Sequence, residues 1–361
     1  MRICFIAPAN NYHTKKWCNW FIKNGDEVHV ISFIKDTIDG ATVHYINTGA
    51  TATASDRQKI RYLFHGREIR KIIKEIQPDI INAHYASSYG AATALAGINN
   101  FFLSVWGLDI YDFPRKSFLH KKLIEFTLSK ASHIMSTSKA MAEETHKYTR
   151  KPIEITPFGV DMDLFNPSKR NRSDGNFVIG NIKKLTSKYG IDYLLKAVAI
   201  VKEDRPNIPI KVRIAGDGPE EQTLKKLSKD LNLTEIITWL GFISQTEAAN
   251  EWANFDVGVI SSVSSSESFG VSAVECQASG VPVIITDPLG LQEATIPGKT
   301  SIVVPRKNEK ALAEAIIDLY DHPEKRKNMG AAGRAFVASE YELNKCFKHI
   351  DEIFLANKKN I

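Results

Sequence analysis

The sequence predicts an α/β protein built from two doubly wound domains, each a parallel sheet wrapped by helices. Three observations lead to this fold class. The 361 residues exceed what one hydrophobic core usually contains. Short apolar runs alternate with amphipathic helical patterns along the chain, as is typical of parallel sheets. The alternation stops once, in the polar stretch 157–175, which reads as a linker, and then starts again.

The first half predicts six strands, at 3–7, 27–33, 43–46, 79–83, 102–105 and 133–137, with helices near 14–24, 57–77, 89–98, 117–130 and 139–147. The loop 8–13 after the first strand has no glycine, which excludes a GxGxxG dinucleotide site. Helix 57–77 has a row of isoleucines and an opposite cationic row. That row is either a solvated outer face or a docking surface for an anionic membrane, reinforced by neighbouring basic pairs. The cations are Arg67, Arg70, Lys71 and Lys74, and the pairs are Arg115-Lys116 and Lys121-Lys122.

The second half predicts strands at 177–180, 210–215, 236–239, 257–260, 283–286 and 302–304, separated by amphipathic helices. A final apolar helical row, 343–354, is followed by no strand and must pack elsewhere. We therefore expect a first domain of residues 1–165 plus the C-terminal helix 341–361, and a second domain of residues 166–340.

Composition limits the class of protein. With 43% apolar and 24% charged residues, no membrane-spanning run and no leader before the first strand, the sequence predicts a cytoplasmic protein. Four scattered cysteines without a CxxC pair predict core thiols. The net charge is +6, and residues 1–165 hold 21 basic against 16 acidic residues. This excess suits an acidic lipid or a pyrophosphate-bearing acceptor and is too weak to indicate nucleic acid.

The chemistry concentrates in 264–280, SSSESFGVSAVECQASG, which follows the apolar run 257–260. Gly270 opens a predicted helix whose unpaired N–H groups and partial positive charge suit a phosphate. Glu267 lies in the loop before that helix and Glu275 lies within it. Carboxylates beside a phosphate site accept hydrogen bonds from sugar hydroxyls. A phosphate flanked by hydroxyls indicates a nucleotide sugar as the ligand.

These residues resemble the Glu-x7-Glu signature of family 4 retaining glycosyltransferases, which have the GT-B fold. The resemblance covers nearly the whole chain, tightly in 177–300 and loosely in 1–110. The further motifs that carry it are Pro157-Phe158-Gly159-Val160-Asp161, Lys183-Lys184-Leu185-Thr186-Ser187-Lys188-Tyr189-Gly190, Ala215-Gly216-Asp217-Gly218-Pro219, Gly280-Val281-Pro282-Val283-Ile284 and Gly290-Leu291-Gln292-Glu293.

The resemblance implies that two Rossmann-like domains face each other across a cleft, with the C-terminal helix crossing back to the first. It places the donor in the second domain and the acceptor in the first. Lys184, Lys188 and Glu267 would be catalytic, the lysines neutralising the departing diphosphate in place of a metal. Glu267 would contact the transferred sugar, Glu275 would bind the ribose, and backbone N–H groups would hold the phosphates. The remaining implied donor contacts are Gly216, Ile243, Ser268, Phe269, Gly270 and Val271. No cofactor and no metal are expected.

The sequence departs from the family pattern at two points. Lys188 is shifted one place from the usual Lys-Gly pair, because Tyr189 precedes Gly190. The family's His-Gly-x-Asp element reads Trp106-Gly107-Leu108-Asp109 here, so the histidine is absent and Asp109 remains as an implied acceptor contact. A side-chain base is therefore not expected, consistent with a mechanism in which the leaving phosphate takes the acceptor proton. His13 and His84 follow first-domain strands and either contact the acceptor or are hydrogen-bonded core or rim histidines.

Asp161-Met162-Asp163 resembles a metal-binding DxD, but it lies beside the linker and not after a core strand, so metal binding is not expected.

The sequence thus predicts a retaining, metal-independent hexosyltransferase. The donor is a nucleotide-diphosphate hexose or N-acetylhexosamine, with UDP expected from family frequency. The acceptor is a lipid-linked or cell-envelope glycan, and the protein is cytoplasmic or peripheral on the inner face of the membrane. Two alternatives stay open at this point: a non-catalytic sugar-nucleotide-binding subunit of a glycan assembly complex, and a nucleotide-sugar epimerase, whose families lack the Glu-x7-Glu pair.

Overall fold

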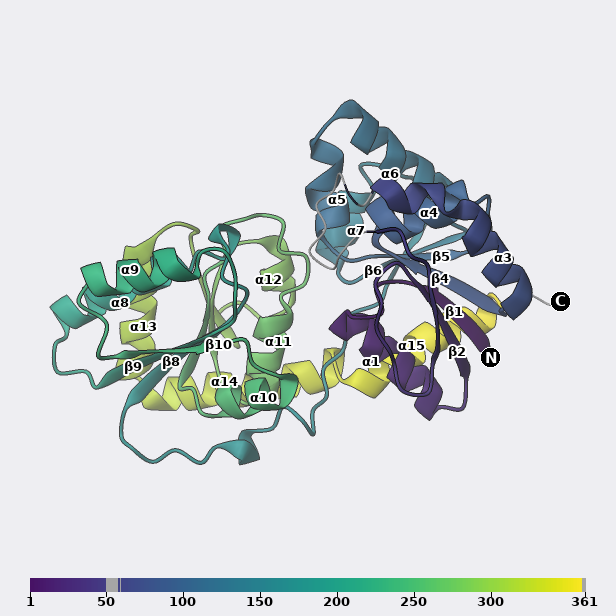
Figure 1. Ribbon diagram of the computed structural model, residues 1–361. Coiled ribbons are helices and arrows are strands. Elements are labelled where there is room, and N and C mark those ends of the chain that lie inside the picture. The colour runs from purple at the N-terminus through teal and green to yellow at the C-terminus, as the bar shows by residue number, and fades with distance from the viewer. Residues whose placement is uncertain (50–57, 59, 359–361) are drawn as a thin grey trace. The chain divides into compact units, whose positions relative to one another are not determined.

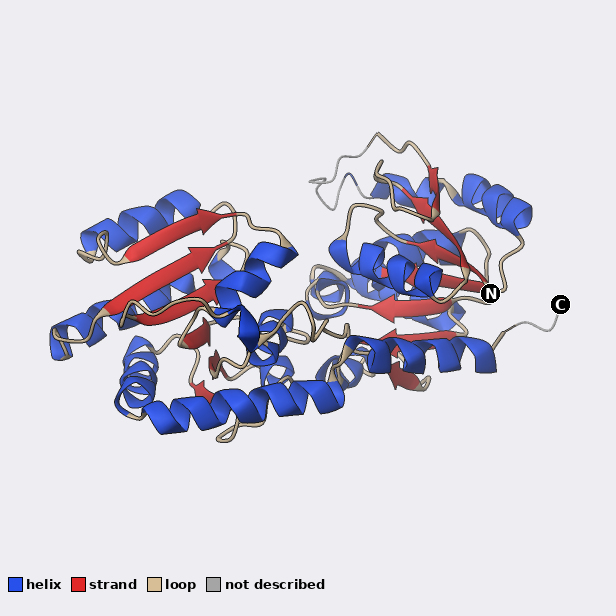
Figure 2. Ribbon diagram, turned by 90° about the horizontal axis from the view of Figure 1, so that it is seen from below, coloured by secondary structure: helices blue, strands red, loops and turns tan. Residues whose placement is uncertain are grey.

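The computed structural model describes residues 1–49, 58 and 60–358, and these form two compact α/β units. The first unit is Met1–Phe158 with Cys346–Ile361, and the second is Gly159–Lys345. Each is a parallel sheet between helices, as Figure 2 shows. The predicted fold class, two Rossmann-like domains, is confirmed. The boundaries predicted from the sequence were after residue 165 and before residue 341.

The first unit has a seven-stranded sheet in the order β3-β2-β1-β4-β5-β6-β7, with every pair parallel. Its strands are β1 (Arg2–Ile6), β2 (Glu27–Ser32), β3 (Thr42–Tyr45), β4 (Ile80–His84), β5 (Phe102–Val105), β6 (His133–Ser136) and β7 (Ile153–Ile155). Its helices are α1 (Tyr12–Lys23), η1 (Ile60–Phe64), α3 (Gly66–Ile76), the π-helix η2 (Tyr85–Tyr89), α4 (Gly90–Leu95), α5 (Leu108–Tyr111), η3 (Phe113–Arg115), α6 (Phe118–Lys130), α7 (Lys139–Thr145) and most of α15 (Leu343–Ala356).

The two faces of this sheet bury different helices, because alternate residues of a strand point to opposite faces. Cys4 and Ile6 of β1 join the core formed with α3, α4 and α6. Phe5, between them, contacts Trp17 and Phe21 of α1.

The C-terminal helix α15 packs on α1, next to which it lies in Figure 1. Its Phe347 contacts Trp17, and stacks on Trp20 with ring centroids 5.6 Å apart. Phe354 stacks on Phe21 at 5.6 Å. The prediction that this helix returns to the first domain is confirmed, and its apolar row finds its partner there.

The second unit has a six-stranded parallel sheet in the order β10-β9-β8-β11-β12-β13. Its strands are β8 (Phe177–Ile182), β9 (Ile210–Ala215), β10 (Ile237–Gly241), β11 (Val257–Ile260), β12 (Val283–Thr286) and β13 (Ser301–Val304). Its helices are η4 (Pro167–Lys169), η5 (Ser187–Tyr189), α8 (Ile191–Asp204), α9 (Glu221–Asp230), α10 (Gln245–Ala253), α11 (Val271–Ala278), α12 (Leu289–Glu293), α13 (Glu309–Asp321) and α14 (Pro323–Glu340). Leucines and isoleucines of α8 and α13 build its core on one face.

Two local expectations differ from the structure. Residues 60–76 of the expected helix 57–77 form two segments, η1 and α3, and residues 57 and 59 lie outside the described residues. Gly66 opens α3, and a Cβ there would come within 3.0 Å of the Ala96 Cα. The short strand β7 was not expected, since three residues carry little periodic signal.

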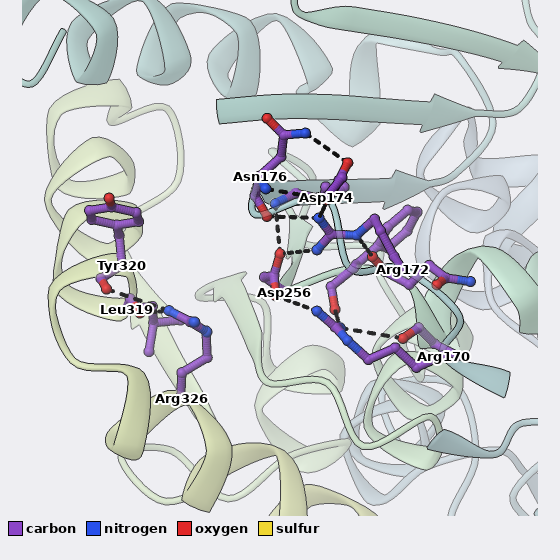
Figure 3. A network of polar contacts seen from close by, with 12 residues as sticks. Arg170, Arg172, Asp174, Asn176, Asp256, Leu319, Tyr320 and Arg326 are labelled. Atoms are coloured by element: carbon purple, nitrogen blue, oxygen red, sulfur yellow. Dashed lines mark hydrogen bonds and ion pairs between the residues drawn. The ribbon is translucent and has the colours of Figure 1, made fainter. Parts of the chain in front are cut away.

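The predicted linker is fixed to the second unit by ion pairs, as Figure 3 shows. Arg170 donates to the carbonyl of Phe255 at 2.9 Å and to the carboxylate of Asp256 at 2.8 Å. Arg172 pairs with the other oxygen of the same carboxylate. Asp256 also accepts from the backbone N–H of Val178 at 2.8 Å, which ties the segment to β8.

Three further features concern the cysteines, the turn at Asp161 and membrane-spanning helices. All four cysteines are buried, as the prediction of core thiols requires. Asp161 accepts hydrogen bonds from the N–H groups of Asp163 and Leu164, so it closes a turn. Among the described residues, no helix is long and apolar enough to cross a membrane.

Candidate active site

The candidate donor site lies where the second sheet reverses its winding. β8 and β11 are neighbours in the sheet, and each is followed by a loop at its C-terminal end. In open α/β sheets such a switch point is where ligands bind. The loop after β8 carries the predicted lysines, and the loop after β11 carries Glu267. The two loops are joined by backbone, since the N–H of Val263 donates to the carbonyl of Lys188 at 2.9 Å.

A buried ion pair occupies this point. Lys183 Nζ lies 3.1 Å from Glu267 Oε1, and the two side chains are only 10% and 11% exposed. Ser262 Oγ donates to the other oxygen of Glu267 at 2.9 Å. The Lys183 ammonium also lies 4.6 Å from the centre of the Tyr189 ring. Burial alone would lower the pKa of Lys183, but the attraction of Glu267 outweighs it and the pKa is raised.

The two lysines predicted as catalytic, Lys184 and Lys188, are placed differently from Lys183. Lys184, the next residue, is exposed, because neighbouring residues of an extended segment point to opposite sides. Lys188 lies with its ammonium 4.7 Å from the Tyr189 ring centre. Tyr189 therefore contacts both Lys183 and Lys188, although the sequence singled it out only as the residue that displaces the lysine.

Close backbone approaches fix these loops. A Cβ at Gly290 would lie 2.2 Å from the Glu267 carbonyl oxygen and 2.6 Å from the Ser268 carbonyl carbon. A Cβ at Gly190, where φ is +59°, would lie 2.3 Å from the Ser261 carbonyl oxygen. Each glycine thus allows a contact that any other residue would block. The Glu267 loop rests on α12, and the Lys188 turn rests on the end of β11.

The helix α11 begins beside this pair. Gly270, at φ 76°, precedes its first residue Val271. Phe269 is buried with its ring edge-to-face against Tyr341 at 5.1 Å, which anchors the turn. Glu275 is buried one turn further on. The first N–H groups of α11 are free of helical partners by geometry and can bind a phosphate.

The other predicted donor contacts lie at the same edge of the sheet. Gly216 follows β9, and its N–H donates to the carbonyl of Gly241 at the end of β10 at 2.7 Å. Ile243 follows Gly241 in the next loop, and Ser268 lies between Glu267 and Phe269. Their contacts with a nucleotide stay predictions.

The predicted acceptor residues gather at the corresponding point of the first unit, beside the neighbouring strands β1 and β4. His13 stacks on Phe158 with centroids 3.9 Å apart, and His84 lies 4.2 Å from the Trp106 ring. His84 has no exposed surface. Burial lowers the pKa of His84 to about 3. Burial, then Lys16 and His84, lower the pKa of His13 as well. Acceptor contact by either ring stays a prediction.

The side chain of Asp109 is held by backbone hydrogen bonds. Its carboxylate accepts from the N–H groups of Ala86 at 2.8 Å, Gly107 at 2.9 Å and Trp106 at 3.3 Å. Burial raises the pKa of Asp109 against the effect of these bonds. The carboxylate ties the turn after β4 to the turn after β5, so it shapes the predicted acceptor region whether or not it touches the acceptor.

The sequence reasoning missed Lys183 as a site residue. It named Lys184 because family members usually have arginine at that position. Lys183 continues β8, where Phe177 and Ile179 point into the core. Strand alternation gave no signal for this, because the even-numbered Val178 is buried as well.

The fold and the candidate site are those of a protein with two parallel-sheet units, the second of which has a buried lysine–glutamate pair beside a helix N-terminus. The family comparison is specific. A model described as "Glycosyl transferases group 1" matches residues 164–336, and one described as "Glycosyl transferase 4-like" matches residues 2–138. The chain belongs to the group 1 glycosyltransferases, in agreement with the predicted resemblance to family 4.

Curated relatives agree with this family. A D-inositol 3-phosphate glycosyltransferase of Pseudarthrobacter chlorophenolicus is 29% identical over 330 residues, covering 81% of this chain and 75% of that protein. A GDP-mannose-dependent monoacylated alpha-(1-6)-phosphatidylinositol monomannoside mannosyltransferase of Corynebacterium glutamicum is 32% identical over 203 residues, 52% of each.

Among structures, sucrose-phosphate synthase from Thermosynechococcus elongatus has a TM-score of 0.85 at 18% identity, covering 99% of this chain and 98% of that one. Anabaena HepE in complex with UDP and glucose has a TM-score of 0.78 at 17% identity, covering 99% and 100%. At these identities, the two structures show only that the folds are alike.

Proposed function

We propose that this glycosyltransferase moves a hexose or N-acetylhexosamine from a nucleoside diphosphate sugar to a hydroxyl of a lipid-linked or cell-envelope glycan. The transfer keeps the anomeric configuration and needs no metal ion. The observation that carries the proposal is the Lys183–Glu267 pair, 3.1 Å apart, beside the start of α11 at the switch point of the second unit.

The residues divide the work as follows. The N–H groups at Gly270 and Val271 bind the diphosphate, and Lys188 neutralises the charge that grows on it as the sugar departs. Lys183 holds the Glu267 carboxylate in place against the transferred sugar. The acceptor oxygen bonds to the anomeric carbon on the face from which the diphosphate leaves. The acceptor proton passes to the leaving phosphate oxygen, so no side-chain base is needed.

Two donor classes are proposed in order. The sequence prediction is a UDP-sugar, and UDP is the nucleotide in the HepE complex. GDP-mannose is the second candidate, because it stands in the name of the Corynebacterium glutamicum relative. Among the described residues no group of three His, Cys, Asp or Glu side chains is placed to hold a metal, and metal independence stays a prediction.

The test is calorimetric titration with UDP-, GDP- and ADP-sugars, with and without Mg²⁺. We expect one nucleotide to bind in the micromolar range, equally well without the metal. Glu275→Ala should weaken that binding, whereas Glu314→Ala, an exposed glutamate on α13, should leave it unchanged. Proton NMR of the product should show the donor's anomeric configuration.

Three results would count against the proposal. Failure to bind any nucleotide sugar would remove its basis. Binding without turnover on any acceptor would favour the non-catalytic subunit. Conversion of the donor without an acceptor would favour the epimerase.

A further inference from the structure

The helix α6 of the first unit has apolar side chains on two of its faces. Its inner face buries Ile124, Thr127 and Leu128 against the core. Its first two residues, Phe118 and Leu119, belong to neither that face nor that core, and they are 70% and 75% exposed. Large apolar side chains that are adjacent and this exposed are unusual on a soluble surface unless something covers them.

Cations surround these two side chains. Arg115 and Lys116 precede them, and Lys121 and Lys122 follow within one turn. The Lys122 ammonium lies over the Phe118 ring at 5.4 Å, so its aliphatic stem runs along the ring. We call residues 115–122 the α6 tip.

The nearby acids neutralise only part of this charge. Glu125 accepts from Lys122 at 2.7 Å and lies 3.8 Å from Lys121. Glu144 pairs with Arg115 at 2.7 Å. Residues 115–122 hold four basic side chains against these two carboxylates, and the Lys116 ammonium lies 5.7 Å from the Phe113 ring centre. Two apolar side chains set among basic ones are the pattern of an element that lies in the headgroup region of a bilayer.

We propose that the α6 tip docks the protein on an anionic lipid bilayer, with Phe118 and Leu119 entering the interface and the lysines contacting the headgroups. This deepens the proposed function, because a lipid-linked acceptor would be met at that surface. A protein partner is less suited to the tip, since a stable interface covers about 800 Å² per partner. One phenylalanine and one leucine supply only a small part of such an area.

A second surface competes with this one. The row of cations that the sequence suggested for docking is on α3, next to the exposed Phe64 of η1. Its isoleucines face the core, Lys71 lies 3.9 Å from Glu75, and Glu68 contacts His65 at 3.0 Å. Besides Phe64, η1 exposes only half of the Ile60 side chain, and the two are four residues apart among charges that partly cancel.

The experiment is co-sedimentation of the full chain with vesicles of phosphatidylcholine alone and of equimolar phosphatidylcholine and phosphatidylglycerol. We expect binding to the anionic vesicles only. Phe118→Ser with Leu119→Ser should lower the partition coefficient about tenfold or more, because the apolar area that enters the interface is lost. Replacing Lys116, Lys121 and Lys122 with glutamine should lower it similarly and flatten its dependence on salt.

The matched control is Phe64→Ser, which removes an equally exposed ring from the competing surface and should leave partitioning unchanged. The proposal is overturned if the α6 tip variants bind as wild type, or if Phe64→Ser abolishes binding instead. Nucleotide binding by each variant is measured in parallel. A thermal melt of each variant shows whether the first unit, which carries the tip, stays folded. Retained nucleotide binding separates a failure of docking from a failure of the proposed donor chemistry.

Discussion

The buried pair of Lys183 and Glu267 should be strongly coupled, and removing either charge should destabilise the second unit. At 3.1 Å and an effective dielectric constant of about 20, the gross attraction is about 5 kcal/mol. Breaking one side of a buried pair costs about 3–5 kcal/mol, because the remaining charge stays buried without its partner. A tenth of each side chain is exposed and Ser262 still contacts Glu267, so we take the lower end, about 3 kcal/mol.

For a unit of this size each kcal/mol shifts Tm by about 2–4 °C. Lys183→Met and Glu267→Gln should therefore each lower the calorimetric Tm of one transition by about 6–12 °C. The double variant buries no unpaired charge. Its Tm should therefore lie well above the value expected from adding the two single losses. Lys184→Met is the matched control, because that neighbouring lysine is exposed and its loss should change stability by less than about 0.5 kcal/mol.

Strong coupling is disproved if the two losses simply add in the double variant, or if Lys184→Met destabilises the protein as much as Lys183→Met. The same four variants also distinguish the contributions of Lys183 and Lys184 to nucleotide binding. Weaker nucleotide binding by Lys184→Met at unchanged Tm would assign the phosphate contact to Lys184, as the sequence predicted.

Three further predictions concern the loops and the buried first-unit site. Gly290→Ala places a Cβ 2.2 Å from the Glu267 carbonyl oxygen, so it should weaken nucleotide binding measured by calorimetry at least tenfold. The control is Gly298→Ala, which strains the backbone at φ 78° but brings its Cβ within 4 Å of nothing; it controls for a general loss of stability and should bind normally. His84 stays neutral in the folded state down to a pKa of about 3, while an unfolded histidine protonates near pH 6.5. The unfolded state therefore binds the extra proton between these values, and stability should fall by about 1.4 kcal/mol per pH unit below pH 6.5 from this residue. Thermal melts of wild type and His84→Gln between about pH 4, inside that window, and about pH 7.5, above it, should differ in their dependence on pH, and equal slopes would contradict the assignment. Asp109→Asn should destabilise the first unit by about 1.5–3 kcal/mol, because an amide cannot accept from three backbone N–H groups as the carboxylate does. Nucleotide binding should survive that change, and its loss would show that Asp109 also shapes the donor site.

Much of the architecture could be predicted because the elements are long and periodic. The apolar runs that became β1, β8 and β11 were each assigned as strands, since parallel strands buried on both faces are continuous hydrophobic runs. The three-residue β7 and the break at His65 between η1 and α3 could not be predicted from periodicity, because both depend on packing against neighbouring elements.

The sequence by itself determined the two Rossmann-like domains, the return of the C-terminal helix and the glycosyltransferase family. The two domains follow from local periodicity, the family follows from motifs contiguous in the chain, and the return of the helix follows from the resemblance that those motifs carry. Only the tertiary structure decided that Lys183, and not Lys184, pairs with Glu267 across 84 positions. It likewise showed that Asp109 is held by three backbone amides, and that Phe118 and Leu119 point away from the core. Each of these depends on which way a side chain turns once distant segments meet, and that direction is set by the packing of the sheet and not by neighbours in the sequence.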